Sequence, residues 1–125
     1  MISVDEVINI HDILIDKFGG SHGIRDINAL ESAITRPFMT FDQKDLYPSL
    51  TAKASALIES LISNHPFIDG NKRVGYVIMR YFLLTSGFDI QATQSEKFEF
   101  VIKIAQNQLT FGQINSWISE KLLKK

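Results

Sequence analysis

The stretch His65-Pro66-Phe67-Ile68-Asp69-Gly70-Asn71-Lys72-Arg73 decides the fold around it, because it is a loop that turns into the start of a helix. The apolar residues that follow recur at helical spacing. The first turn of a helix carries backbone N–H groups without internal partners, and the helix dipole adds partial positive charge there. The sequence therefore predicts an anion site at this helix start.

Two cations occupy the predicted first turn, Lys72 and Arg73. Positive charges at a helix start oppose the dipole by about 0.3–1 kcal/mol each. A phosphate bound between them would reverse that sign. Gly70 would let the backbone approach the anion closely, and Asn71 would add an amide donor. Because the two cations break a local rule without visible compensation, they indicate a functional site.

A carboxylate and an imidazole precede the two cations. Magnesium usually takes one or two carboxylates plus substrate phosphates, so Asp69 alone suffices as its protein ligand. His65 can accept a hydroxyl proton near neutral pH, because its imidazole is neutral there. Each residue also has an ordinary interpretation, as a loop histidine, a carboxylate paired with Arg73, a turn glycine or solvated charges. The combination at this spacing favours the functional interpretation.

On both sides of this stretch the pattern is helical, with no confident strand. Pro48 is expected in a first helical turn, residues 36–47 as a loop or small hairpin, and Phe67 in the core. Six helices in one domain, residues 1–125, predict an all-α bundle. They are expected at 4–18, after Asp26 up to Pro37, at 50–61, from about Gly70 to Ser86, after Thr93 and after Thr110.

Composition limits the classes of function. A net charge of −1 argues against nucleic-acid binding, and the absence of cysteine excludes thiolate catalysis. No apolar run approaches the roughly 18 residues of a membrane span. We therefore expect a soluble, cytoplasmic protein that binds neither membranes nor nucleic acid directly, with Lys124 and Lys125 free to fray.

The stretch resembles the signature of the Fic/Doc family, His-x-Phe-x-Asp/Glu-Gly-Asn-x-Arg, and matches each fixed position. Lys72 stands where most Fic enzymes have a second glycine, which favours the Doc (death-on-curing) branch. Tyr76 is a second departure, because adenylylating Fic enzymes have an arginine there. The resemblance extends over nearly the whole chain and implies a compact bundle of about six helices of Fic/Doc type, with the signature on a central loop and helix.

The resemblance also implies roles for the residues. It makes His65 the base that deprotonates a target hydroxyl and Asp69 the ligand of Mg²⁺ on ATP. Residues 36–47 take the place of the family's flap, which aligns a target segment. Phosphate binding is implied for Gly70, Asn71, Lys72 and Arg73, and target contact for Phe38, Phe41 and Tyr47.

The implied activity is that of a Doc-like toxin of a toxin–antitoxin pair. In Doc proteins the lysine goes with transfer of the γ-phosphate of ATP to a protein hydroxyl, a threonine of elongation factor Tu, which blocks translation. A separate antitoxin protein would restrain the toxin. Two alternatives stay open: a Fic-type adenylyltransferase, which attaches AMP to a protein hydroxyl, and a non-catalytic Fic-like binding module.

Overall fold

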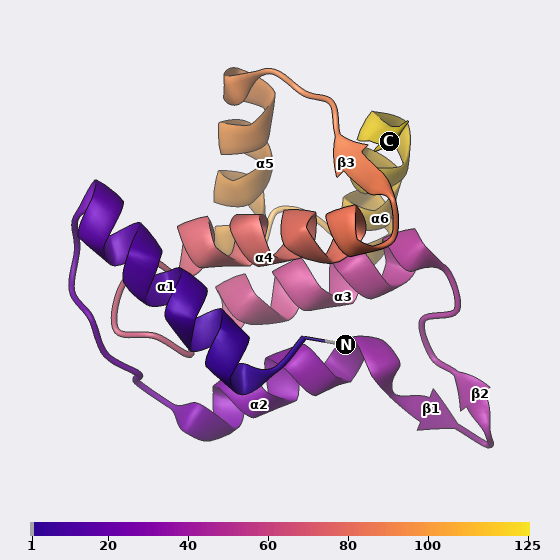
Figure 1. The fold of residues 1–125 in the computed structure, drawn as a ribbon. Helices are drawn as coiled ribbons and strands as arrows, with labels where there is room; N and C mark the ends of the chain where they lie inside the picture. Colours follow the sequence, from indigo (N-terminus) through magenta and orange to yellow (C-terminus); the bar gives the residue numbers. More distant parts are fainter. Residues whose placement is uncertain (1) are drawn as a thin grey trace.

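The computed structural model describes residues 2–125 and confirms the predicted all-α class, with two small two-stranded sheets added (Figure 1). Figure 1 shows α3 and α4 side by side at the centre, with α1 and α2 on one side and α5 and α6 on the other. The helices are α1 (Val4–Phe18), α2 (Ile27–Thr35), the short 3-10 helix η1 (Arg36–Phe38), α3 (Leu50–Ser63), α4 (Asn71–Thr85), α5 (Gln94–Ala105) and α6 (Phe111–Lys121).

Side-chain caps set most of the helix starts. Capping boxes begin α1, α5 and α6, formed by Ser3 with Glu6, Thr93 with Glu96 and Thr110 with Gln113. In each box the hydroxyl accepts one orphan backbone N–H, and the third residue of the helix accepts another. Asp26 caps α2, as predicted.

The start of α3 differs from the prediction. Ser49 is its N-cap and accepts the Ala52 N–H at 3.1 Å, so the helix begins at Leu50. Pro48 therefore lies before the cap and not in the first turn. The serine wins because its hydroxyl can satisfy an orphan N–H, which proline cannot do.

Residues 36–47 form the small hairpin that the sequence left as one option. After η1, strand β1 (Thr40–Phe41) pairs antiparallel with β2 (Lys44–Asp45). Asp42 and Gln43 form the turn with φ of 52° and 64°. Positive φ at both central residues matches the twist of a two-residue hairpin.

The carboxyl-terminal residues are paired, contrary to the prediction that Lys124 and Lys125 are free to fray. Strand β3 (Phe88–Ile90) pairs antiparallel with β4 (Leu122–Lys124). The Lys125 N–H also donates to the Gly87 carbonyl at 2.8 Å. The ladder satisfies the backbone of these residues, although the side chains of Lys124 and Lys125 stay exposed.

Two apolar clusters share α3 and α4. The first joins these helices to α1 and α2 and includes Val7, Leu30, Leu57 and Phe67. The second joins them to α5 and α6. Phe67 is 1% exposed, so its predicted core role is confirmed. Within residues 2–125, no helix is long and apolar enough to span a membrane.

Candidate functional site

The signature loop takes its shape from the segment between α1 and α2. The Arg25 and Asp26 N–H groups both donate to the Pro66 carbonyl, at 2.8 and 3.1 Å, and Ile68 N–H donates to the Gly23 carbonyl at 3.1 Å. Ile24 and Phe67 form an antiparallel bridge. Residues 23–26 therefore hold the loop through backbone hydrogen bonds around one isolated β-bridge.

Arg25 fixes the backbone at the predicted base. Its Nε donates to the His65 carbonyl at 2.5 Å and its Nη2 to the Asn64 carbonyl at 2.7 Å. His65 has φ of 47°, an uncommon value for a non-glycine residue. Such a conformation persists where the surroundings impose it, and Arg25 supplies that constraint. The imidazole itself is exposed, as a proton acceptor for a protein hydroxyl has to be.

Asn71 closes the loop from the other end. Its Oδ1 accepts the Phe67 N–H and its Nδ2 donates to the Phe67 carbonyl, both at 2.9 Å. The side-chain amide is thus engaged by the protein's own backbone. What Asn71 offers to an anion is its backbone N–H, at the first position of α4.

The carboxylate of Asp69 is held at the entrance of α4. Oδ2 accepts the Ser21 N–H at 3.1 Å and Oδ1 accepts the Gly70 N–H at 2.8 Å. A Cβ on Gly20 would lie 2.8 Å from Oδ2, so only a glycine at this position leaves room for the carboxylate of Asp69 where it lies. Asp69 is exposed, and each oxygen keeps a lone pair for a further partner.

Gly70 serves the fold in a way that its predicted role did not include. It caps α4 with φ of 78°, and an added Cβ would lie 3.2 Å from Ile15 and 3.4 Å from Nε2 of His11. The missing side chain therefore makes room for α1, and the close approach of an anion at Gly70 stays a prediction.

His11 supports the signature loop from the core side. It is 1% exposed and stacks on the Phe67 ring with centroids 3.8 Å apart. Its Nε2 lies 2.7 Å from the Asp69 carbonyl oxygen. A carbonyl only accepts, so Nε2 carries the proton, and His11 is a hydrogen-bonded core histidine.

The signature side chains surround one hollow of about 290 Å³ at the start of α4. Arg73 is exposed and stacks on the half-exposed ring of Phe18, with its guanidinium carbon 4.8 Å from the ring centroid. Phe18 thus fixes a cation beside unpaired helix N–H groups. The lining residues are His65, Ile68, Asp69, Gly70, Asn71, Lys72, Arg73 and Ala105.

The three aromatic residues of the hairpin region are not part of this hollow. Phe38 packs edge-on against Phe82, and Tyr47 is half-buried, with its hydroxyl accepting Nε of Arg36 at 2.9 Å. Only Phe41 is freely exposed, at 75%. Figure 1 shows the hairpin before α3 and the signature loop after it, so the 14-residue helix separates them by about 20 Å.

Five supporting residues were missed as site residues by the sequence reasoning: His11, Phe18, Gly20, Ser21 and Arg25. Gly20 and Arg25 belong to the stretch Gly19-Gly20…Gly23-x-Arg25-Asp26, which resembles the family's first third, and this resemblance was the available signal. No spacing rule connects this stretch to residues 64–69, because the contact is tertiary. The sequence pattern indicated Phe18 only as the last apolar residue of the first helix.

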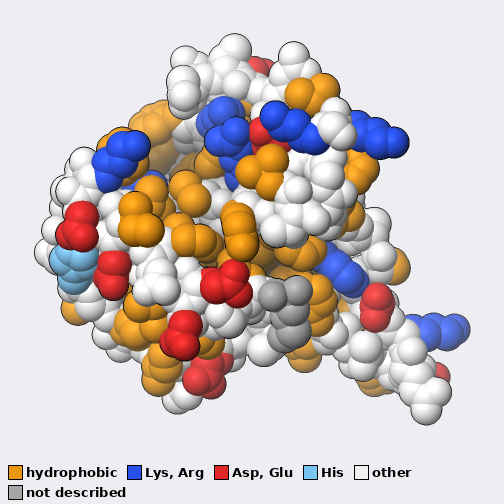
Figure 2. All heavy atoms as spheres, viewed as in Figure 1, with side chains coloured by type: hydrophobic (Ala, Val, Ile, Leu, Met, Phe, Trp, Pro, Cys, Tyr) orange, Lys and Arg blue, Asp and Glu red, His pale blue; other side chains and the backbone are white. Residues whose placement is uncertain are grey.

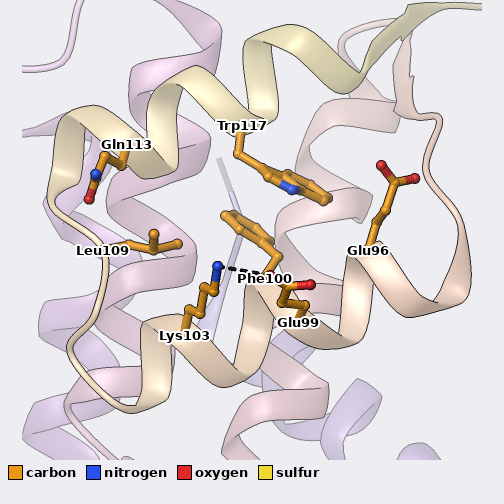
Figure 3. A pocket seen from close by; sticks show the side chains of 7 residues that line it. All are labelled: Glu96, Glu99, Phe100, Lys103, Leu109, Gln113 and Trp117. Carbon is orange, nitrogen blue, oxygen red and sulfur yellow. Dashed lines mark ion pairs between the residues drawn. The ribbon is translucent and has the colours of Figure 1, made fainter.

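A second hollow of about 240 Å³ lies between α5 and α6 (Figure 3). It contains the stacked rings of Phe100 and Trp117, with centroids 3.8 Å apart. Its acids are paired with lysines: Glu99 with Lys103 at 2.8 Å, and Glu96 with Lys121 at 2.7 Å. The Lys121 hydrogen bond is the main cause that lowers the pKa of Glu96 to about 2. No free acid is left for proton transfer there.

Comparison with known proteins identifies relatives of the part of the chain that carries the signature. The protein called Toxin Doc of Mycolicibacterium smegmatis is 41% identical over 75 residues. That alignment spans 60% of this chain and 58% of the length of that relative. The family model described as Fic/DOC matches residues 1–83, which include the whole signature and the segment that holds it. With two thirds of its residues matched by that model, the chain belongs to the Fic/DOC family.

Proposed function

We propose that this chain is a Doc-like toxin that transfers the γ-phosphate of ATP to a protein hydroxyl. One observation carries the proposal: an exposed imidazole, an exposed carboxylate, two cations and the amino-terminal end of α4 surround a single hollow. Phosphoryl transfer depends mainly on positioning and charge neutralisation, and this hollow offers groups for both.

The residues divide the work as follows. The backbone N–H groups of α4 and the guanidinium of Arg73 hold the phosphate oxygens. His65 accepts the proton of the target hydroxyl as the oxygen attacks the γ-phosphorus. The new O–P bond forms as the bond to ADP breaks, and the proton stays on the imidazole until solvent removes it. Arg25 and Asn71 keep the loop in place during this step.

Asp69 has the properties of a magnesium ligand. Its carboxylate is a hard oxygen donor, exposed, and oriented by the Ser21 and Gly70 N–H groups. No group of three or more potential metal-ligating side chains occurs among residues 2–125, so one carboxylate with substrate phosphates is the expected mode. Bound magnesium would neutralise phosphate charge.

Lys72 supports transfer of phosphate rather than AMP. It lines the hollow, where a glycine would leave room for phosphates along the helix start. The lysine fills part of that room and adds a charge, which favours a nucleotide with its γ-phosphate beside His65. The alternative reaction is AMP transfer, which requires the nucleotide to bind in the opposite orientation, with its α-phosphate beside His65.

The biological role rests on the relative. The name Toxin Doc of the Mycolicibacterium smegmatis protein supports a toxin held by an antitoxin protein. We propose a threonine of elongation factor Tu as the target and the cytoplasm as the place of action. Modification of that factor would stop translation.

The test uses ATP labelled at either the α- or the γ-phosphate, with Mg²⁺, a cell lysate and the purified chain. The proposal predicts γ label on one lysate protein of the size of elongation factor Tu, with mass spectrometry finding one added phosphate on a threonine. Retained α label would instead establish adenylylation, and no label on any protein would support a non-catalytic binding module.

His65→Ala is the control for catalysis. The imidazole is exposed and makes no side-chain hydrogen bond among residues 2–125, so the variant should fold with an unchanged melting temperature. Labelling should fall at least ~100-fold, as general-base removal typically costs 10²–10⁴-fold. Growth inhibition by His65→Ala equal to that of the unchanged chain would contradict catalysis.

A further inference from the structure

A histidine outside the signature hollow lies between two acids of α1. Nδ1 of His22 is 3.0 Å from Oδ1 of Asp12, and Nε2 is 2.7 Å from Oδ1 of Asp16. The side chains of His22 and Asp12 are each 49% exposed and that of Asp16 is 73% exposed, so solvent can reach all three. Within residues 2–125, one further ion-pair distance involves them, the 3.9 Å from Nδ1 of buried His11 to Oδ1 of Asp12.

This geometry requires His22 to be protonated. An ionised carboxylate only accepts hydrogen bonds, so both ring nitrogens have to donate at the same time, and only the imidazolium carries a proton on each nitrogen. The hydrogen bond to Asp12, followed by that to Asp16, raises the pKa of His22 above its ordinary value of 6.5. In a neutral ring, one nitrogen would present its lone pair to a carboxylate, and that hydrogen bond would be lost.

The positions of the two acids favour a cation between them. Asp12 and Asp16 are four residues apart on α1, where like charges repel each other. Asp16 also lies in the last turn of this helix, where the dipole disfavours negative charge. The imidazolium of His22 offsets both effects, because it places a positive charge against each carboxylate.

His22 also lies between two residues whose backbone contacts the signature loop. On one side, the Ser21 N–H donates to Oδ2 of Asp69 at 3.1 Å. On the other side, the Gly23 carbonyl accepts the Ile68 N–H at 3.1 Å. A movement of His22 away from α1 would therefore disturb both hydrogen bonds.

The segment around His22 needs an anchor because it is rich in glycine. Gly19, Gly20 and Gly23 have positive φ, and ordering a glycine costs more conformational entropy than ordering any other residue. The other charged side chains beside the segment are engaged by main-chain groups. Arg25 donates to two carbonyls, and Asp69 accepts two N–H groups. His22 thus makes the charged contact between this segment and α1.

We propose that His22 is a pH-sensitive clamp, which fastens residues 19–26 to α1 when it is protonated and releases them when its imidazolium gives a proton to solvent. The clamp does not depend on the proposed function, because it concerns the hold on the signature loop and not a reaction. Since the folded-state pKa is raised, the clamp is complete below the ordinary value of 6.5 and is lost as the pH rises through the higher folded value. The Ser21 and Ile68 N–H groups should then open more often.

Amide hydrogen exchange, followed by NMR on the full chain from about pH 5.5 to about pH 8.5, tests the clamp on both sides of the ordinary histidine pKa. The protection factors of the Ser21 and Ile68 N–H groups should fall about fivefold over this range, the size of effect expected from exposed ion pairs. In His22→Ala both should already be low at the acid end and should change little with pH. Circular dichroism checks that this variant of an exposed residue is folded.

Asp16→Asn removes one charged acceptor and should move the titration midpoint of the His22 ring, read from its NMR signals, toward 6.5. Asp5→Asn is the matched control, because it removes the same charge from the first turn of α1 and does not contact His22. It should leave the midpoint and the exchange unchanged.

Three results would each overturn the clamp: a His22 ring in the unchanged chain that titrates at its ordinary pKa, equal protection at both ends of the pH range, or a pH dependence in His22→Ala equal to that of the unchanged chain. None of them would affect the proposed phosphate transfer, because the measurements use no nucleotide and no target protein.

Discussion

At the scale of single residues, the place of the Asp69 carboxylate is set by what Gly20 lacks. A side chain at Gly20 would collide with Oδ2, and the next residue, Ser21, donates its N–H to the same oxygen. Gly19 has a similar positive φ, 93° against 117°, but has no atom within 4 Å of an added Cβ. A side chain at either glycine strains the backbone, but only one at Gly20 also contacts the carboxylate of Asp69. Comparing the two positions therefore distinguishes these two effects.

Gly20→Ala should weaken Mg²⁺-dependent binding of ADP by at least about tenfold, the usual cost of disturbing the support of a metal ligand. Both Gly20→Ala and Gly19→Ala should lower the free energy of unfolding by roughly 1–3 kcal/mol, because both place a side chain at positive φ. Calorimetry of ADP binding with and without Mg²⁺ measures the difference. Equal Mg²⁺-dependent affinities for the two variants would contradict the role of Gly20.

The signature residues could be found from the sequence because they are consecutive and their types are unusual together. Their individual contacts could not be found in this way. The side chain of Asn71 binds the backbone of Phe67, and Gly70 makes room for Ile15 and His11. Both facts depend on how the loop curves and on how α1 packs, which residue types alone do not reveal.

At the scale of elements, Arg80 ties α4 to β3. Its Nε and Nη2 donate to the two oxygens of Asp89 at 2.6 and 2.9 Å. The Asp89 side chain is only 8% exposed, whereas that of Arg80 is 46% exposed. The Arg80 hydrogen bonds are the main cause that lowers the pKa of Asp89 to about 2. The ionised carboxyl is therefore bound more tightly in the folded state than in the unfolded state.

Arg80→Met should lower the free energy of unfolding by about 2 kcal/mol at pH 7, because it leaves the buried carboxylate of Asp89 with only the more distant Lys125 Nζ, at 3.8 Å, as a cation. Since the folded pKa of Asp89 lies below its ordinary value of 3.8, the stabilisation is complete above about pH 4 and disappears as the pH falls toward 2. Urea unfolding between pH 7 and 2 should show the gap between variant and unchanged chain closing over that range.

Lys103→Met is the matched control, since it removes an exposed pair with Glu99 at 2.8 Å on α5. Exposed pairs contribute at most about 1 kcal/mol. A loss from Lys103→Met as large as that from Arg80→Met would contradict the distinction between the two pairs.

The helices could be predicted well because caps and apolar periodicity coincide, as Ser3 with Glu6 illustrates. The β1–β2 hairpin was predicted only as one of two options, and the β3–β4 sheet was not predicted. Strands of two or three residues are too short to show an alternating pattern, and β3 meets β4 more than thirty residues later in the chain. Lys124 therefore looked like a solvated end, although its backbone completes a ladder.

At the scale of the whole molecule, α3 and α4 separate two apolar clusters, and β4 closes the second. Figure 2 shows Lys and Arg side chains gathered across the upper part of one face, with most acidic side chains below them. This uneven distribution coexists with a net charge of −1. A neutral total therefore conceals a basic region, which is why composition alone says little about the charge of a site.

Deletion of residues 122–125 should lower the free energy of unfolding by about 3 kcal/mol. It removes the β3–β4 ladder and the packing of Leu122 against the second cluster, at about 1 kcal/mol for each lost hydrogen bond. Thermal unfolding followed by circular dichroism measures the change. Leu123→Ser keeps the backbone pairing and changes a side chain that is 42% exposed, so it should melt near the unchanged chain. If the deletion variant has the same melting temperature as Leu123→Ser, a structural role for β4 is contradicted.

The dependence of residues 64–68 on residues 20–26 has a further consequence for cooperativity. The signature loop is held by backbone contacts to the segment between α1 and α2, although it is joined in sequence to α3 and α4. A partial opening that releases the first quarter of the chain would abolish the site while the α5–α6 side of the molecule stays intact. A protease that nicks the linker after α1 would thus loosen the signature loop in a molecule that remains largely helical.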